Sequence, residues 1–592
     1  MTADAYLSVL SSLNRDVLAH VKCILLISPT SGSNSLLHPY IQKTGLEVEV
    51  ISSYYGGNQM KRKLITLLAA VTALALLAGC GKAENGQTDV SSPKQELVYA
   101  TVKDINDMNP HLYPGSMPAQ GMVYESLVEN TPEGIKPLLA ESWDISEDGT
   151  VYTFHLRQGV TFHDGEPFNA EAVKQNIDAV QHNAVKHSWI RLSTKIIDTK
   201  AVDENTFQMT LSEPYYPALL ELSMTRPYVF LSPKDFINGE TKDGVNGHNG
   251  TGPYRLTEHQ TDQYAIFEAN PDYWNGAPEI KKITAKVLPT GETTFLALQK
   301  GEVNFIFTDD RGTDSIDTEA MDCLIEAGDY QVVRSEPMNT KVIVANSSKA
   351  GSPAQEKAVR EAIWHAIDRE SIANQIFNGK ETPAETLFSA NVNYADIELK
   401  TRTYDLQAAA QLLDDAGWTV SEGGIRSKEG KVLSMELYYD AASISQKTQA
   451  ELIQNTVKGI GMELKLIGED SSSIANRRAS GTYDLLFNQT WGLAYDPQST
   501  VSAFTSESSY YHATSGIAQA EQLFEKINNV MATTTEDQRK SLYTDILTIV
   551  HDEAIFIPIT NGNLTVVAPS SLQGIAFKQT QFELPFENMH FE

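Results

Sequence analysis

Side chains suited to chemistry are few in this chain, and they do not form the usual catalytic patterns. Its three cysteines are Cys23, Cys80 and Cys323, so no CxxC pair exists. This excludes dithiol redox chemistry and paired-thiolate zinc sites, and three cysteines cannot build a disulfide framework. We find no GxSxG, no HExxH, no P-loop and no GxGxxG after a strand. The pattern favours a binding protein over an enzyme.

Cys80 is the cysteine with an informative context. A basic triplet at 61–63 precedes an apolar run from Leu64 to Leu77, and Ala78-Gly79 leads into Cys80. This is the layout of a secretory signal, and the run is shorter than the ~20 apolar residues of a membrane span. The small residues before Cys80 resemble a bacterial lipoprotein box, in which the thiol is acylated and becomes the mature N-terminus. Acyl chains supply ~0.8 kcal/mol of membrane affinity per buried CH₂.

These features predict the organisation of the first 94 residues. We expect translation to begin at Met60, with residues 1–59 an upstream extension foreign to the native protein, because they show no coherent pattern. Residues 60–79 are predicted to be a signal peptide, and the polar residues 80–94 a lipid-anchor tether. The protein is therefore expected outside the cytoplasm, anchored to the cell membrane through Cys80.

Length and charge restrict the function further. The chain has 592 residues, too many for one compact core. Its formal net charge is -30, which disfavours binding to nucleic acid and adsorption to anionic lipid through a basic patch. A local pocket can carry the opposite sign, so the net charge does not identify a ligand.

Helices and strands are predicted to be mixed along the chain, which indicates α/β lobes. Alternation predicts a strand over 151–156 after an Asp148-Gly149 turn. Helical spacing predicts helices over 170–180 with Asn169 as N-cap, over 359–376, over 405–416 with Gly417 as the stop, and over 451–461 before a strand at 462–466.

Three stretches carry a resemblance to a known family. They are LAESW with SEDGT, YTFHLR and GVTFHDGEPFNA (139–170); GTGPY with NPDYW (250–254 and 270–274); and VREA with AIDR (359–362 and 366–369). They are similar to the signature of the peptide/nickel family of ABC-transporter solute-binding proteins, family 5. The resemblance extends from about residue 96 to the end of the chain.

The resemblance implies an α/β, two-lobed periplasmic-binding-protein-like fold (type II, cluster C), hinged, with a discontinuous lobe I. We place lobe I at 95–340, lobe II at 341–560, and a C-terminal return to lobe I at 561–592. It also implies a monomer that delivers its ligand to the transmembrane subunits of an ABC permease and has no catalytic cofactor.

Within the family, the chain resembles the nickel-binding members. Their marks here are NPHLY (109–113), MVYE (122–125), Arg226-Pro227, TWG with YDP (490–497), and HDEA (551–554). The implied ligand is Ni²⁺ complexed with a small organic chelator such as L-histidine. By position, Arg226 would hold a chelator carboxylate, a pairing that suits its planar guanidinium. Trp189 and Trp491 would wall the pocket, Met117 and Tyr495 would line it, and His512 would ligate the metal.

Three departures from the nickel-binding pattern leave open the shape of the pocket and the identity of the chelator. Lys186 stands where these members carry a second arginine, Ala475 replaces a pocket tyrosine, and Gln498 replaces a histidine. The histidines His111, His155, His163 and His365 lie within strand, turn or helix patterns and are predicted to be structural.

Alternative functions remain at this point. A peptide receptor is the main one, but peptide-binding relatives carry an aspartate where this chain has Ala494, and a buried ammonium needs an anionic partner. A receptor for another metal–metallophore complex, such as cobalt or zinc with an opine-type metallophore, is a second, because these metals compete for similar ligands. A lipoprotein hydrolase is a third, although no nucleophile–base pair supports it.

Overall fold

The computed structural model describes residues 96–187, 190–308, 325–326, 328–493, 497–507, 509–580 and 583–592, apart from the side chain of Glu292. The chain from Gln95 onward forms one compact unit. The predicted signal peptide, Cys80 and the tether lie outside the described residues. In the described part, no helix is both long and apolar enough to span a membrane.

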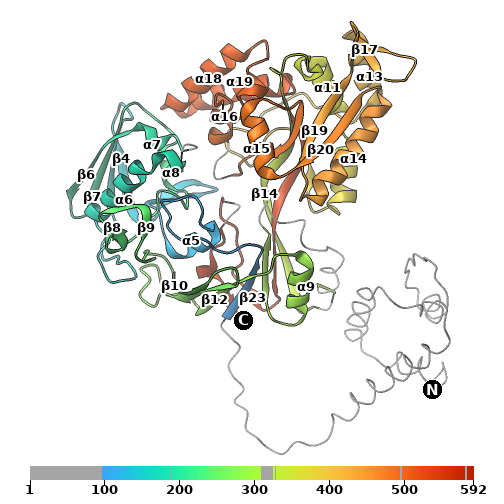
Figure 1. The fold of residues 1–592 in the computed structure, drawn as a ribbon. Coiled ribbons are helices and arrows are strands. Elements are labelled where there is room, and N and C mark those ends of the chain that lie inside the picture. Colours follow the sequence, from blue (N-terminus) through green and yellow to red (C-terminus); the bar gives the residue numbers. More distant parts are fainter. Residues whose placement is uncertain are drawn as a thin grey trace, which may run out of the picture. The chain divides into compact units, whose positions relative to one another are not determined.

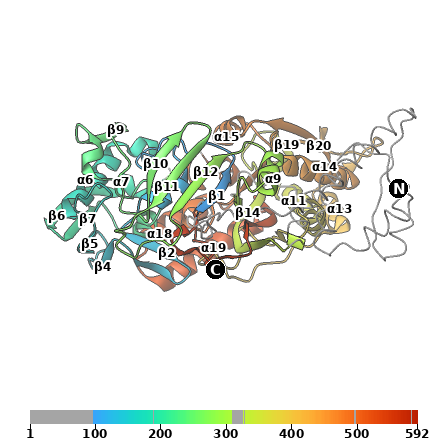
Figure 2. The same cartoon turned by 90° about the horizontal axis from the view of Figure 1, so that it is seen from below.

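A mixed sheet of 11 strands runs through this unit in the order β10-β11-β12-β1-β13-β22-β14-β21-β19-β20, with β15 beside β22. Figure 2 shows β10, β11, β12 and β1 lying side by side in this order. The strands are β1 (Glu96–Thr101), β10 (Tyr254–Gln260), β11 (Tyr264–Ala269), β12 (Lys282–Val287), β13 (Phe305–Thr308), β14 (Tyr330–Ala345), β15 (Thr382–Pro383), β19 (Ser434–Asp440), β20 (Glu463–Glu469), β21 (Leu485–Gln489) and β22 (Phe556–Pro569).

Residues 96–308, here the first region, add a smaller antiparallel sheet in the order β4-β5-β7-β6. Its strands are β4 (Ala140–Ile145), β5 (Val151–Leu156), β6 (Ile196–Asp203) and β7 (Thr206–Leu211). Tyr152, Phe154 and Leu156 alternate along β5 and are buried, as the sequence predicts. Helix α6 (Ala170–His182) packs on this sheet and begins at Asn169, whose side chain accepts the Ala172 N–H.

The other elements of the first region are short. They are α5 (Met117–Val123), β2 (Val128–Thr131), β3 (Gly134–Pro137), η1 (Ala184–His187), α7 (Leu192–Lys195), α8 (Ala218–Leu222), η2 (Pro233–Asp235), β8 (Phe236–Ile237), β9 (Glu240–Val245) and α9 (Gly291–Gln299).

Residues 346–555, here the second region, carry most of the remaining helices (Figure 1). They are η4 (Pro353–Gln355), α11 (Lys357–His365), α12 (Arg369–Ser371), η5 (Ile372–Ile376), α13 (Leu406–Asp415), α14 (Ile444–Gly459), α15 (Ser471–Ser480), α16 (Gln498–Ala503), α17 (Tyr511–Thr514), α18 (Ala520–Ala532) and α19 (Glu536–Asp552). A small sheet of β16 (Thr419–Val420), β17 (Arg426–Lys428) and β18 (Lys431–Val432) follows α13.

Two long antiparallel strands connect the regions. Residues 330–334 of β14 pair with 565–569 of β22, beside β13 of the first region. Residues 341–345 of β14 pair with β21, beside the second region. The predicted lobe boundaries, 340/341 and 560/561, therefore fall inside these strands and stay predictions. A pair of strands crossing between two bodies is suited to act as a hinge.

The C-terminal segment packs against the first region. It contains β23 (Leu572–Gln573), η6 (Phe586–Asn588) and β24 (His590–Phe591). Its buried residues Leu572, Phe586 and Met589 share one apolar cluster with Leu97 and Tyr99 of β1. Burial at roughly 25 cal/mol per Å² of apolar surface makes this cluster a substantial attachment.

The helices and strands predicted from the sequence are largely present, with one error. The predictions of α13 with Gly417 after it, and of a helix followed by a strand at α14 and β20, are confirmed, although α14 begins at Ile444. The single helix predicted over 359–376 is wrong. It breaks after His365, because Asp368 turns out of helical geometry and caps a new start by accepting the Ser371 N–H.

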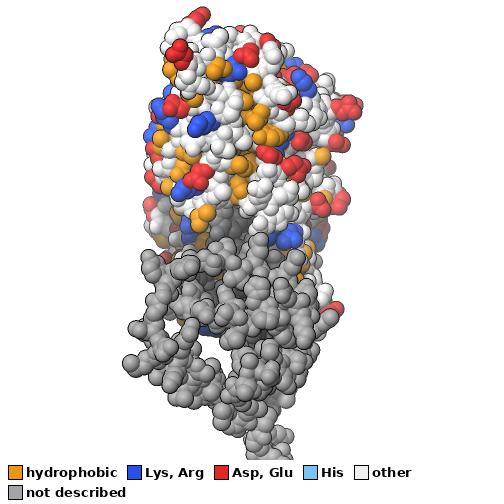
Figure 3. All heavy atoms as spheres, turned by 90° about the vertical axis from the view of Figure 1, so that its right-hand side faces the viewer, with side chains coloured by type: hydrophobic (Ala, Val, Ile, Leu, Met, Phe, Trp, Pro, Cys, Tyr) orange, Lys and Arg blue, Asp and Glu red, His pale blue; other side chains and the backbone are white. Residues whose placement is uncertain are grey.

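On the face drawn in Figure 3, the described side chains of both charge signs are interspersed with apolar ones. Many of the charged groups are paired, for example Arg477 with Glu469 and Lys526 with Asp545. Surface pairs of this kind usually contribute little to stability.

Candidate ligand-binding site

Arg226 is the best-positioned cation among the predicted site residues. It is only 4% exposed, and its Nη1 donates to the carbonyls of Tyr113 (2.6 Å) and Gly115 (2.7 Å). Its guanidinium also lies 4.5 Å from the centroid of the Tyr113 ring. A Cβ at residue 115 would lie 2.3 Å from the Asp107 carbonyl oxygen, so this close approach requires glycine. Arg226 thereby fixes the loop that leads into α5.

Two more predicted residues belong to segments beside Arg226. Met117, the first residue of α5, is buried directly after the loop that Arg226 holds. Lys186 is exposed on η1, and its neighbour His187 is bonded through Nε2 to the His111 carbonyl at 3.0 Å. Burial, together with the Arg226 charge, lowers the pKa of His187. Arg226, Met117 and the segment carrying Lys186 therefore come together, whereas Trp189 lies outside the described residues.

Glu221 anchors the chain immediately after Trp189. This carboxylate is 3% exposed and accepts hydrogen bonds from Leu192 N (2.7 Å) and the Tyr215 hydroxyl (2.6 Å). Its burial raises its pKa to about 7. Glu221 thus positions the start of α7.

The raised pKa of Glu221 predicts a pH-dependent stability. Because the folded-state pKa lies above the ordinary value of 4.5, this group favours folding at low pH, and its contribution is lost as pH rises from about 4.5 to about 7. Glu221→Gln removes that titration. We expect the free energy of unfolding of the wild type, relative to Glu221→Gln, to fall between pH 5 and pH 7. Urea denaturation at both pH values measures it, and a difference that does not change with pH contradicts the prediction.

Trp491 lies in the second region, just beyond the end of β21. Its backbone N–H donates to the Thr500 hydroxyl at 3.4 Å, and its half-buried side chain packs on the largest apolar cluster. The preceding Thr490 exchanges hydrogen bonds with Thr340 of β14, through its N–H at 2.9 Å and its hydroxyl at 3.1 Å. Trp491 is therefore fixed near the middle of the hinge strand β14. Tyr495 lies outside the described residues.

His512 lies at the opposite end of β21. Its carbonyl accepts the Ser348 N–H at 3.2 Å, and its ring packs so closely on Gly481 that a Cβ there would lie 2.7 Å from Nδ1. The five residues of β21 separate this place from Trp491, a span of about 16 Å at ~3.3 Å per residue. The structure does not bring His512 to Trp491, and its role as a metal ligand stays a prediction.

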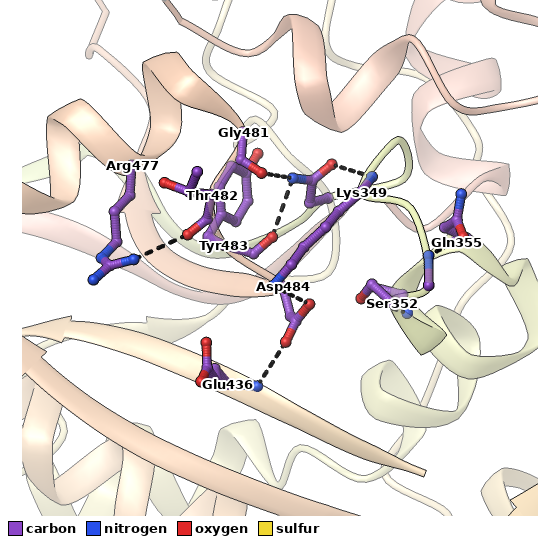
Figure 4. A network of polar contacts seen from close by, with 12 residues as sticks. Lys349, Ser352, Gln355, Glu436, Arg477, Gly481, Thr482, Tyr483 and Asp484 are labelled. Carbon is purple, nitrogen blue, oxygen red and sulfur yellow. Dashed lines mark hydrogen bonds and ion pairs between the residues drawn. The ribbon is translucent and has the colours of Figure 1, made fainter. Parts of the chain in front are cut away.

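A polar network fixes the segment between α15 and β21, next to His512 (Figure 4). Asp484 pairs with Lys349 at 2.8 Å and accepts the Glu436 N–H at 3.0 Å. Asn346 donates to the carbonyls of Gly481 (2.9 Å) and Tyr483 (3.1 Å). These bonds link the start of β21 to the residues directly after β14, at the beginning of the second region.

The two regions are in direct contact near α16. Arg191, beside α7, donates through Nη2 to the Ser502 carbonyl (2.9 Å) and the Thr505 hydroxyl (3.1 Å). Farther along, the hydroxyl groups of Tyr216 and Tyr543 are hydrogen-bonded. The sequence reasoning missed Arg191 and Glu221, because their partners are backbone atoms or distant residues that no local pattern reveals.

The described residues do not form a metal centre of their own: no group of three or more His, Cys, Asp or Glu side chains among them is placed to hold a metal ion. The histidines predicted to be structural have protein partners. The His111 ring bonds to Thr241 and Val229, His155 to Asp144, His163 to Gly252, and His365 to Thr403. Among the predicted site residues, the described part of the chain holds a buried cation (Arg226), an exposed lysine (Lys186) and a half-buried aromatic side chain (Trp491), and a site made of these side chains would suit an anionic ligand.

Comparison with known proteins places this chain in a family. The model of the bacterial extracellular solute-binding proteins, family 5, matches residues 134–512. The nickel-binding periplasmic protein of Escherichia coli is 39% identical over 498 residues, which cover 83% of this chain and 94% of that protein. The chain belongs to family 5 of the bacterial extracellular solute-binding proteins.

Solved structures agree with this family and fold. The family 5 protein NikA from Brucella suis, in complex with Fe(III)-EDTA, superposes with a TM-score of 0.81 at 38% identity, covering 85% of this chain and all of that one. The family also contains the dipeptide-binding protein of E. coli, which is 24% identical over 84% of this chain and 94% of that protein. The two-lobed periplasmic-binding fold predicted from the sequence is confirmed.

The N-terminal residues match a different kind of protein. The model of staphylopine dehydrogenase matches residues 1–78, which include the predicted upstream extension and most of the predicted signal peptide. None of this segment is among the described residues, and the family 5 match begins beyond it.

Proposed function

We propose that this family 5 protein captures Ni²⁺ as a chelate with a small carboxylate-bearing molecule, such as L-histidine, and delivers it to an ABC permease from outside the cytoplasm, anchored through Cys80. The observation that carries the proposal is the 39% identity, over most of both chains, with a nickel-binding periplasmic protein. The Fe(III)-EDTA complex of the Brucella relative supports it, because that ligand is also a metal held by carboxylates.

The predicted residues have distinct roles in this proposal. Arg226 pairs with a chelator carboxylate, Lys186 adds a second positive charge, and Trp189, Trp491, Tyr495 and Met117 line the space between the lobes. His512 is the proposed metal ligand. The bound chelate contacts both lobes and so favours the closed state, which the permease recognises.

A second candidate, an opine-type metallophore complex, is favoured by one observation. Residues 1–78 match staphylopine dehydrogenase, an enzyme whose name contains an opine. We expect residues 1–59 to be an upstream extension and not part of the native protein, so the match favours an opine only as the product of an enzyme encoded beside this binding protein. This ligand would use the same cationic site, because Arg226 recognises a carboxylate on any chelator.

Isothermal titration calorimetry tests the proposal against the peptide alternative. The protein is titrated with Ni²⁺ plus L-histidine, with a nickel–opine complex, and with a dipeptide. We expect one-to-one binding of at least one nickel chelate and none of the dipeptide. Binding of the dipeptide alone would make this chain a peptide receptor, and a preference for the opine complex would select the second candidate.

A further inference from the structure

Helix α16 is polar yet entirely buried. Its sequence is QSTVSA, and each of its six residues is 8% exposed or less. Buried polar groups are usually hydrogen-bonded, because leaving one without a partner costs about 1–3 kcal/mol. A polar helix at this depth therefore has to be explained by what its side chains contact.

Two of the four polar side chains of α16, those of Thr500 and Ser502, have the following hydrogen-bond partners. The Ser502 hydroxyl donates to the Ser499 carbonyl at 3.1 Å, and the Thr500 hydroxyl accepts from Trp491 N. Gln498 differs from both: it is 3% exposed, and its Nε2 donates no hydrogen bond within the described part of the chain. An amide nitrogen can only donate, so the missing partner must be an acceptor.

The position of Gln498 in the sequence relates it to the predicted site. It lies two residues before Thr500, which holds Trp491, and four residues before Ser502, which receives Arg191 from the first region. Figure 1 shows α16 among the elements of the second region, where it contacts α18. Gln498 is therefore in the short helix that joins a predicted pocket wall to the contact between the two regions.

We propose that Gln498 is a specificity-determining residue that donates its amide N–H to a carboxylate oxygen of the bound chelate. The inference rests on the proposed function and deepens it, because it assigns the second region a contact with the same class of group that Arg226 holds from the first. The amide is neutral at every physiological pH, so it selects an acceptor without adding charge. A hydrated nickel ion would present water O–H donors to the Gln498 N–H, which is itself a donor, so the two groups do not match.

The test compares two nickel chelates that differ by one carboxylate. Histamine is L-histidine without its carboxyl group and keeps the imidazole and the amine. Wild-type protein and Gln498→Met are titrated with each nickel complex, because methionine retains the volume and removes the donor. We expect Gln498→Met to lose about tenfold or more in affinity for nickel–histidine, the usual effect of removing a hydrogen bond to a charged group, and to bind nickel–histamine as the wild type does.

Thermal unfolding of the unliganded protein separates binding from structure. Removing a partnerless buried donor should leave the Tm of Gln498→Met unchanged or raise it, whereas a structural role predicts a lower Tm. Gln449→Met is the matched control, since Gln449 on α14 is 1% exposed and its Oε1 also has no partner in the described structure. It should bind both complexes as the wild type does.

Two results overturn the proposal. One is unchanged affinity of Gln498→Met for nickel–histidine, and the other is an equal loss for the histidine and histamine complexes, which would show that Gln498 does not contact the carboxylate. Failure of the wild type to bind any nickel chelate would instead remove the proposed function, so the two failures are distinguishable.

Discussion

Replacing Arg226 by alanine is expected to weaken the binding of a carboxylate-bearing nickel chelate by about 100-fold or more, the usual range when one partner of a buried charged pair is truncated. Two causes combine. The substitution removes the cation that meets the carboxylate, and it also releases the Tyr113 and Gly115 carbonyls that Nη1 holds at 2.6 and 2.7 Å. The loop before Met117 then loses its fixed position.

A conservative substitution separates these two causes. Arg226→Lys keeps the charge but loses the planar fork, so we expect an intermediate affinity. Arg360→Lys is the matched control, because Arg360 is 1% exposed and its Nη1 likewise donates to two backbone carbonyls, those of Ala354 and Gln355. It should lower the Tm and leave the dissociation constant unchanged. Calorimetry with nickel–histidine measures each variant, and wild-type affinity in Arg226→Ala would exclude Arg226 from the site.

Local patterns in the sequence predicted local structure well. The alternation over 151–156 and the cap at Asn169 depend on neighbouring residues, and both are found. The continuous helix over 359–376 was wrong because apolar spacing continues across the break, while the Asp368 side chain accepts the Ser371 N–H and so starts a new helix. The spacing of apolar residues reveals the buried face of a helix. It does not reveal a side-chain hydrogen bond to the backbone that competes with continuation of the helix.

The candidate site was only partly predictable for the same reason. The family resemblance identified Arg226, and the structure adds that it is buried and holds a loop. Arg191 and Glu221 were not found, because Arg191 bonds to a backbone carbonyl 311 residues away and Glu221 to a backbone N–H 29 residues away. His512 was proposed from the resemblance to the nickel-binding members, and in the structure its ring packs on Gly481, at the other end of β21 from Trp491. Such relations arise from tertiary contacts alone.

Nickel ions without a chelator are expected to bind at least about 100-fold more weakly than nickel–histidine, because the charge-assisted contact between Arg226 and a carboxylate is then absent. No group of three or more potential ligand side chains within the described residues is placed to replace it. The 76 acidic side chains will attract free Ni²⁺ to the surface, but such exposed, screened contacts are weak and lack a fixed stoichiometry.

The comparison is made by titrating the metal-free protein with Ni²⁺ alone and then in the presence of excess L-histidine. Tight binding at a one-to-one ratio should appear only in the second titration and should disappear in Arg226→Ala. His512→Ala then reports on the proposed metal ligand: if His512 coordinates nickel, the visible absorption of the bound metal changes with this substitution. Equally tight one-to-one binding of Ni²⁺ without histidine would mean that the protein itself supplies the coordination sphere, and the ligand would then be the ion and not the chelate.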